Sequence, residues 1–274
     1  MNLPEEEMVS LLPELVTIAR RAGDAILDVY AGDIDVTMKD DFSPLTQADI
    51  ASHQVIKAAL ARLATSDIPL LSEESADIPF QTRRQWYEYW LVDPLDGTKE
   101  FINRNGEFTV NIALVRDGRP VLGVVHVPVR GQSYFGAVGS GAWRQDADQP
   151  PVAISTRRPP AALPVVVGSR SHANPQLEAA LAPIGAHAMV NMGSSLKFCL
   201  VAEGAADLYP RLGLTSEWDT AAAQAVVEAA GGQVLQLNGA PLSCNEKESY
   251  LNPWFLVVGD PNAGWLERLA LPLE

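Results

Sequence analysis

The chain has 274 residues and carries 34 acidic side chains against 20 Lys and Arg, so its formal net charge at pH 7 is −14. This balance argues against binding to nucleic acid polymers or anionic membranes, since both require clustered basic side chains. Two cysteines exclude a disulfide-rich scaffold and a cysteine-rich zinc site. An anionic substrate would be repelled by this overall negative charge. A bound metal ion would therefore be needed to make the electrostatic potential at the binding site positive.

The N-terminus lacks the basic segment and apolar run of a secretory signal. No apolar run approaches the ~20 residues that span a bilayer. We therefore expect a soluble cytoplasmic protein without a transmembrane segment. At roughly 150 residues per domain, the length fits one large domain or two modest ones.

The first part of the chain predicts helices with an antiparallel sheet. Apolar residues at helical spacing predict helices over residues 10–30 and 48–63, with Pro13 in the first turn of the former. Apolar runs between turn residues predict strands at 36–38, 69–72, 89–92, 108–116, 121–127, 133–137 and 142–144. Residues 117–120 predict a hairpin turn. The glycine-rich segment 136–141 predicts another, because it lacks the GxGxxG order and the Walker lysine of a nucleotide loop.

Five prolines lie between Asp148 and Pro164 and indicate a crossover or a domain boundary. We expect an α+β domain over residues 1–150 and an α/β domain over residues 151–274. The later pattern predicts a strand at 165–167 and helices near 175–181, 194–203 and 215–231. Cys199 lies in an apolar run of the second of these helices, which favours a buried cysteine over a nucleophile.

One segment carries the most information: the run from Trp90 to Thr98, which reads WLVDPLDGT. An apolar strand brings Asp93 to its carboxyl end, and the turn at Pro94 brings Asp96 to the same side. Gly97 allows a ligand to approach the backbone closely, and free N–H groups there form an anion site. Two carboxylates repel a phosphate, but bridging divalent cations make them good phosphate binders. An isolated Asp-x-x-Asp-Gly is usually a simple turn, so further carboxylates are needed.

Three other segments supply those acids. Glu73 follows the strand at 69–72, Asp49 stands three residues after Thr46, and Asp219 opens the Ala-rich helix. Singly, these acids fit a solvated surface charge, a helix capping box and a favourable helix-dipole contact. All four segments together favour a divalent metal centre that promotes a displacement at phosphorus.

The order of these motifs resembles the inositol monophosphatase superfamily of metal-dependent, lithium-sensitive phosphatases. The resemblance rests on Lys39 with Ser43-Pro44-Leu45-Thr46-x-Ala48-Asp49, Ser72-Glu73-Glu74, Asp93-Pro94-Leu95-Asp96-Gly97-Thr98 and Trp218-Asp219-x-x-Ala222. Within the superfamily, residues 96–101, 168–172 and 193–199 resemble bacterial 3′(2′),5′-bisphosphate nucleotidases more than inositol phosphatases. The resemblance implies a layered αβαβα sandwich that combines α+β and α/β parts. Most metal ligands would lie in the first domain, with Asp219 and the substrate-selecting residues in the second.

The resemblance also implies roles for individual residues. Two or three Mg²⁺ ions would be held by the carboxylates of Glu73, Asp93, Asp96 and Asp219 and by the carbonyl of Leu95. Asp49 and Thr98, with Glu73, would orient and deprotonate the attacking water. The substrate would contact a set of residues around the reacting phosphate, namely Glu73, Leu95, Asp96, Gly97, Thr98 and Asp219.

A substrate with two phosphates needs a second anion site, and the resemblance places it at Ser194, Lys197 and Arg211. From the residues alone, a capped surface helix with a solvated lysine is an equal alternative. Arg170 and His172 follow a strand and are candidates to flank the base.

The resulting hypothesis is a Mg²⁺-dependent phosphatase that converts adenosine 3′,5′-bisphosphate to AMP and phosphate. It would also act on 3′-phosphoadenylyl sulfate, which ties it to sulfate assimilation. Inositol-1-phosphate hydrolysis is the alternative within enzymes, and a non-catalytic divalent-metal-binding protein is the alternative of another class. By analogy the protein is a monomer or homodimer that binds a small nucleotide and no nucleic acid polymer. It is expected in the cytoplasm, with peripheral attachment to the inner face of the bacterial inner membrane as an option.

Overall fold

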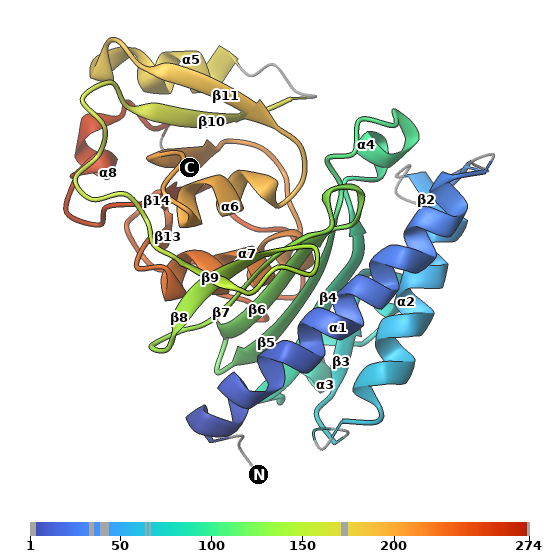
Figure 1. The fold of residues 1–274 in the computed structure, drawn as a ribbon. Coiled ribbons are helices and arrows are strands. Elements are labelled where there is room, and N and C mark those ends of the chain that lie inside the picture. The colour runs from blue at the N-terminus through green and yellow to red at the C-terminus, as the bar shows by residue number, and fades with distance from the viewer. Residues whose placement is uncertain are drawn as a thin grey trace.

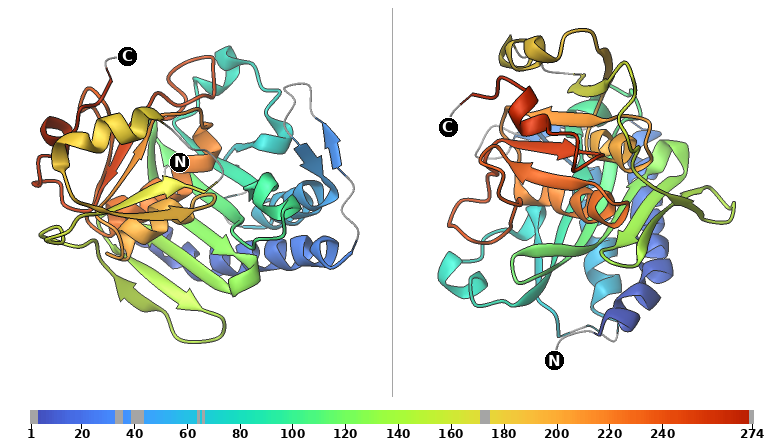
Figure 2. Two further views of the ribbon diagram at one scale, coloured as in Figure 1. Left: turned by 90° about the horizontal axis from the view of Figure 1, so that it is seen from above. Right: turned by 90° about the vertical axis from the view of Figure 1, so that its left-hand side faces the viewer.

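The computed structural model describes residues 4–32, 36–38, 44–63, 65, 67–170 and 175–272. Lys39, Ser43 and His172 lie outside these ranges. The described chain forms five layers: two helices, a large sheet, two central helices, a smaller sheet, and two outer helices (Figure 1). In the turned views of Figure 2, the blue N-terminal helices and the gold and red C-terminal elements lie on opposite sides of the molecule. The expected αβαβα sandwich is confirmed.

The large sheet has seven strands in the order β3-β4-β5-β6-β7-β8-β9. The bounds are Leu70–Ser72, Glu88–Asp96, Thr109–Arg116, Arg119–Val127, Gln132–Ala137, Gly141–Asp146 and Val152–Ile154. β3 and β4 are parallel, and the other neighbours are antiparallel. The glycine-rich turn between β7 and β8 is therefore confirmed. The expected turn at 117–120 is too long, because β6 already begins at Arg119, and a register shift beside Val115 accommodates Pro120.

Both faces of the central strands β4, β5 and β6 are buried, which explains their nearly continuous apolar runs. Along β5, Ile112 and Leu114 face the N-terminal helices, while Ala113 and Val115 face the central helices. The N-terminal helices are α1 (Glu5–Tyr30) and α2 (Gln47–Leu60), with the short hairpin β1 (Val36–Met38) and β2 (Pro44–Thr46) between them.

The placement of Pro13 in a first turn is wrong, because α1 begins at Glu5 and encloses it. Acidic residues at the N-terminal end of a helix interact favourably with its dipole, and Glu6 and Glu7 stand in the first turn of α1. Pro13 itself lies on the exposed face of the helix, while Leu12 and Leu15 are buried.

The smaller sheet is mixed, in the order β11-β10-β12-β14-β13. The bounds are Ala188–Met192, Val165–Ser169, Leu208–Arg211, Phe255–Val258 and Gln233–Gln236. β10 is parallel to both neighbours, and the remaining pairs are antiparallel. The outer helices α5 (Pro175–Leu181) and α8 (Trp265–Arg268) cover its far side.

The central helices are α6 (Leu196–Ala202) and α7 (Glu217–Ala229), and Cys199 is buried in α6 as expected. α7 lies unusually close to the large sheet: a Cβ on Gly123 would be 2.0 Å from the Ala222 carbonyl oxygen. The small side chains of α7 and a glycine in β6 permit this approach. Shorter helical segments are η1 (Glu73–Ser75), α3 (Phe80–Arg83), α4 (Thr98–Ile102), η2 (Pro128–Arg130) and η3 (Ala182–Ile184).

The proline-rich crossover joins the two sheets. The first sheet extends to Ile154, and the second begins at Val165. Buried Asp207 holds the crossover by accepting hydrogen bonds from Val165 N at 2.7 Å and Arg157 Nε at 2.8 Å. The division into domains at residue 150 stays a prediction. Among the described residues, every helix is too short or too polar to cross a membrane.

Candidate metal centre and substrate pocket

Asp93 and Asp96 both belong to β4, which continues past Val92 instead of ending there as the sequence suggested. Asp93 pairs with Asn111 of β5, and Asp96 pairs with Thr109. The two acids are three residues apart on β4 while their partners are two residues apart on β5, so β4 contains one extra residue, a β-bulge, between them. Side chains alternate along a strand, and residues three apart would normally point to opposite faces. The extra residue of this bulge reverses that parity and turns both carboxylates to the same side.

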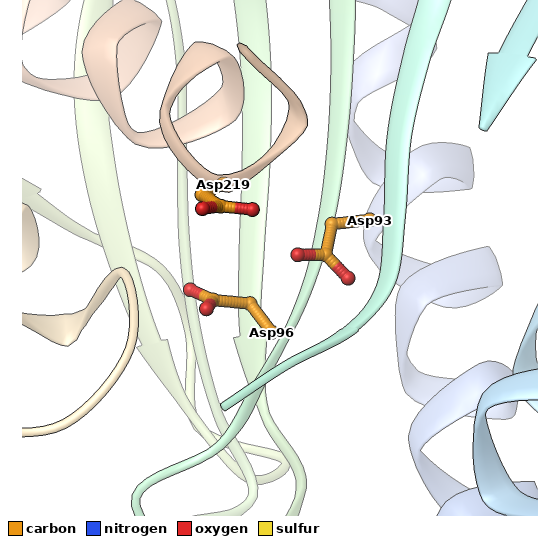
Figure 3. Close-up of side chains that lie close together, drawn as sticks. All are labelled: Asp93, Asp96 and Asp219. Atoms are coloured by element: carbon orange, nitrogen blue, oxygen red, sulfur yellow. The ribbon is translucent and has the colours of Figure 1, made fainter. Parts of the chain in front are cut away.

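The third carboxylate comes from α7. Asp219 occupies the first turn, where its Oδ2 accepts the Ser216 N–H at 2.9 Å in a capping box. Figure 3 shows Asp93, Asp96 and Asp219 facing one another across the space between β4 and α7. One carboxylate oxygen from each lies within 4.8 Å of the others. An acid in the first turn of a helix and a β-bulge are each ordinary features. Here they bring three carboxylates together.

This cluster is electrostatically costly when it holds no cation. Burial first, and then the charges of Glu73, Asp96 and Asp219, raise the pKa of Asp93 well above its usual value. Burial and Asp96 do the same for the pKa of Asp219. Glu73, at the start of η1, also forms a side-chain hydrogen bond with Asp93. Oxygen ligands at this density match the preference of small divalent cations, whose charge would remove the repulsion. The residues therefore fit a divalent metal centre.

Asp96 is oriented by Ser195, the N-cap residue of α6, a contact that the sequence did not indicate. The Ser195 N–H and hydroxyl lie 2.6 and 2.8 Å from Asp96 Oδ2. The same hydroxyl lies 2.6 Å from the Asp219 carbonyl oxygen and accepts a hydrogen bond from Asn111 Nδ2 at 2.8 Å. Two adjacent serines before an apolar helix were the available signal, but the sequence does not reveal which acid they contact.

Two of the residues expected to activate water, Asp49 and Thr98, lie at the N-terminal ends of α2 and α4. Asp49 accepts hydrogen bonds from Thr46 N at 2.8 Å and Thr46 Oγ1 at 2.7 Å, so the capping box is confirmed. Thr98 is the first residue of α4, and Gly97, at a φ of +93°, occupies the N-cap. Leu95 is buried and donates its N–H to Asp93 Oδ1 at 3.0 Å. The pairing of Asp49 with Thr98 stays a prediction.

A cavity of about 120 Å³ connects the acids with basic groups. Asp96 and Asp219 line it together with Lys197, Tyr209 and Arg211. Lys197 is 8% exposed, so the alternative of a solvated surface lysine is wrong. Its Nζ donates to the Ser194 carbonyl oxygen at 2.5 Å. Burial lowers the pKa of Lys197 to about 8, while Asp96 acts in the opposite direction.

Two residues that line this cavity, Ser194 and Arg211, each have a buried polar atom without a partner among the described residues: Ser194 Oγ and Arg211 Nε. Buried polar atoms without a hydrogen bond are unfavourable and uncommon, so a ligand that bonds to both would be stabilised there. A hydroxyl and a guanidinium N–H are both donors that an anion accepts from.

A second cavity of about 430 Å³ shares Ser169 with the first. Its lining includes Leu177, Leu181 and Met189 together with Arg170. The Arg170 guanidinium pairs with Glu107 at 2.7 Å, a partner that no motif in the sequence indicated.

Comparison with known proteins agrees with this geometry. The Inositol monophosphatase family matches residues 7–267. The 3′(2′),5′-bisphosphate nucleotidase CysQ of Escherichia coli K12 is 52% identical over 251 residues, which cover 90% of this chain and 99% of that protein. The crystal structure of CysQ from Bacteroides thetaiotaomicron is similar with a TM-score of 0.77 and 41% identity, covering 88% of this chain and 94% of the other. The inositol monophosphatase from Anabaena is similar with a TM-score of 0.73 and 25% identity, covering 94% of each chain.

Proposed function

This chain belongs to the inositol monophosphatase family, and we propose that it is a divalent-metal-dependent 3′(2′),5′-bisphosphate nucleotidase that converts adenosine 3′,5′-bisphosphate to AMP and phosphate. The observation that carries the proposal is the single cavity shared by Asp96 and Asp219 with Lys197 and Arg211. A bisphosphate substrate, of which one phosphate is cleaved, needs acids that hold the metal ions at the reacting phosphate and basic side chains that bind the other phosphate. The similarity to bisphosphate nucleotidases over nearly the whole chain supports the same substrate class.

We assign the metal ligands to Glu73, Asp93, Asp96 and Asp219, with the Leu95 carbonyl as a further ligand, and the ions to two or three Mg²⁺. When bound, such ions neutralise phosphate charge and make a water molecule more acidic. The chain's own contribution is to keep these carboxylates converged through the β4 bulge and the α7 capping box.

Asp49 and Thr98 would orient the attacking water and accept its proton. Glu73 would take part in the same step. The capping box holds the Asp49 carboxylate in one orientation at the start of α2. Backbone N–H groups at Gly97 and Thr98 would hold oxygens of the reacting phosphate. Phosphoryl transfer requires mainly such positioning and charge neutralisation.

The phosphate that is not cleaved would bind Lys197, Arg211 and Ser194. The buried ammonium of Lys197 and the partly buried guanidinium of Arg211 line the cavity before substrate arrives, which reduces the entropy lost on binding. The apolar second cavity beside Ser169 provides space for the nucleoside. We extend the proposal to 3′-phosphoadenylyl sulfate, and to a cytoplasmic monomer or homodimer that can attach peripherally to the inner membrane.

The test is phosphate release from adenosine 3′,5′-bisphosphate and from inositol 1-phosphate, side by side, with and without Mg²⁺. We expect a strong Mg²⁺-dependent preference for the nucleotide. Preference for the inositol ester would replace the proposed specificity with that of an inositol phosphatase. Tight metal binding with no release from either substrate would indicate a non-catalytic metal-binding protein.

A further inference from the structure

Glu107 joins the two sheets beside the metal centre. It lies between α4 and β5 and is 7% exposed. Its carboxylate accepts two hydrogen bonds from Arg170, each 2.7 Å long, and one from the Gly193 N–H at 2.8 Å. Arg170 follows β10, and Gly193 follows β11. Glu107, just before β5 of the large sheet, therefore binds the segments that follow two strands of the smaller sheet.

The Gly193 contact continues directly to the residue that orients Asp96. Gly193 is followed by Ser194, whose φ of +42° is rare for a residue with a side chain. A Cβ on Gly193 would lie 2.9 Å from the Glu107 carbonyl oxygen, so this turn lies directly against the Glu107 backbone. The next residue, Ser195, bonds to Asp96 through both its N–H and its hydroxyl.

The charges around Glu107 keep its carboxylate ionised. Burial alone would raise the pKa of Glu107, but the hydrogen bonds from Arg170 and Gly193 and the charge of Arg170 lower it. Arg130 also lies 4.0 Å from the carboxylate. Arg170 is 47% exposed, and the pair with Glu107 restrains a guanidinium that would otherwise be mobile.

We propose that Glu107 is a positioning residue for phosphate hydrolysis: it holds the Gly193 N–H and thereby sets the turn from which Ser195 orients Asp96. Arg170 acts through Glu107, by fixing its carboxylate. This inference rests on the proposed function for its effect on turnover, but its effect on metal binding is independent of the substrate.

The experiment compares Glu107→Ala, Glu107→Gln, Arg170→Met and the double variant E107A/R170M with the wild type. Glu88→Ala is the matched control, because Glu88 is also a buried acid that pairs with an arginine, Arg116, at 2.6 Å. The three readouts are kcat and KM for adenosine 3′,5′-bisphosphate, the Kd of Mn²⁺ measured by calorimetry without substrate, and the thermal unfolding midpoint.

We expect Glu107→Ala to lower kcat and to weaken Mn²⁺ binding, each about 10-fold or more, as is typical when a group that orients a metal ligand is lost. Glu107→Gln retains an oxygen that accepts from the Gly193 N–H, so its kcat and its affinity for Mn²⁺ should stay close to those of the wild type. The double variant should be no worse than Glu107→Ala, while Glu88→Ala should alter only the unfolding midpoint.

Three outcomes would overturn the inference. Glu107→Gln could be as impaired as Glu107→Ala, which would make the charge the important property and not the bond to Gly193. Arg170→Met could add its own loss on top of Glu107→Ala, which would mean that Arg170 contacts the substrate directly. Glu107→Ala could shift the unfolding midpoint as Glu88→Ala does, with kcat and Mn²⁺ binding unchanged. If the wild type releases no phosphate, the proposed function fails, and Mn²⁺ binding alone decides the role of Glu107.

Discussion

Ser195 donates toward a single carboxylate oxygen of Asp96 through both its backbone N–H, at 2.6 Å, and its hydroxyl, at 2.8 Å, across 99 residues of chain. The same hydroxyl lies 2.6 Å from the carbonyl oxygen of Asp219. One serine at the start of α6 thus contacts two of the three clustered acids. Because α6 packs on the smaller sheet and Asp96 belongs to the large one, this contact aligns the two halves of the site.

Ser195→Ala should lower kcat/KM for the bisphosphate about 10- to 100-fold, since loss of a group that orients a metal ligand has effects of this size. The backbone N–H remains, so the fold should survive and the far-ultraviolet circular dichroism should not change. Steady-state kinetics over a range of Mg²⁺ concentrations provide the measurement. Wild-type kinetics in the alanine variant would show that the hydroxyl does not orient Asp96.

The buried charge of Lys197 should control recognition of the second phosphate. Lys197→Met, which preserves much of the side-chain volume, should raise KM for adenosine 3′,5′-bisphosphate more than KM for a nucleoside 3′-monophosphate. The pKa of Lys197 is about 8, so the ammonium is present below that pH and is lost above it. The kcat/KM of the wild type should therefore fall above about pH 8 for the bisphosphate, and this decline should be absent in Lys197→Met. Equal changes for both substrates would exclude the assigned role.

Removing one acid from the metal cluster should stabilise the metal-free protein while it abolishes turnover. The pKa of Asp93 is raised in the folded state, so the metal-free fold loses stability as pH rises from the unfolded-state pKa through the folded-state pKa. Asp93→Asn relieves this repulsion and retains an oxygen for the Leu95 N–H. At pH 7 in a chelator, the variant should unfold at a higher temperature than the wild type. A lower unfolding temperature would contradict the electrostatic account of the cluster.

His126, in β6, should make the protein acid-sensitive. The ring lies under α1, where a Cβ on Gly23 would be 2.8 Å from it, and its Nδ1 is 2.9 Å from Ser133 Oγ. Burial, and secondarily Arg20, lower the pKa of His126 to about 4. The unfolded chain takes up a proton near pH 6.5, so stability is complete above that pH and decreases as pH falls toward 4. The loss should approach roughly 3 kcal/mol.

Denaturant unfolding of the metal-free protein between pH 7 and 4 measures this loss. His126→Gln should flatten the pH dependence, whereas His187→Gln, at a partly exposed position, should leave it unchanged. An identical pH dependence in His126→Gln and the wild type would assign the acid sensitivity to other groups.

Local features of this chain could be predicted from the sequence because they depend on neighbouring residues. The helical spacing of α2, the alternation of β5 and the acids at helix starts reflect backbone geometry over a few residues. The DPLDGT segment and the order of the other acidic motifs were sufficient to indicate the family and the candidate metal ligands. The starting point of α1 was missed because a proline inside a helix is locally unfavourable, and only the packing of Met8 and Leu12 extends the helix past it.

The tertiary structure decided what depends on contacts between distant segments. The sequence shows that Asp93 and Asp96 are three residues apart, but the bulge that turns them to one side exists only because β5 pairs with β4. Lys197 could equally have been a solvated side chain, and its burial follows from the position of α6 between the sheets. Ser195 with Asp96, and Glu107 with Arg170 and Gly193, are pairs of ordinary residues 63 to 99 positions apart. No local pattern marks such pairs, because the free energy that brings them together comes from burial of the surrounding sheets and helices.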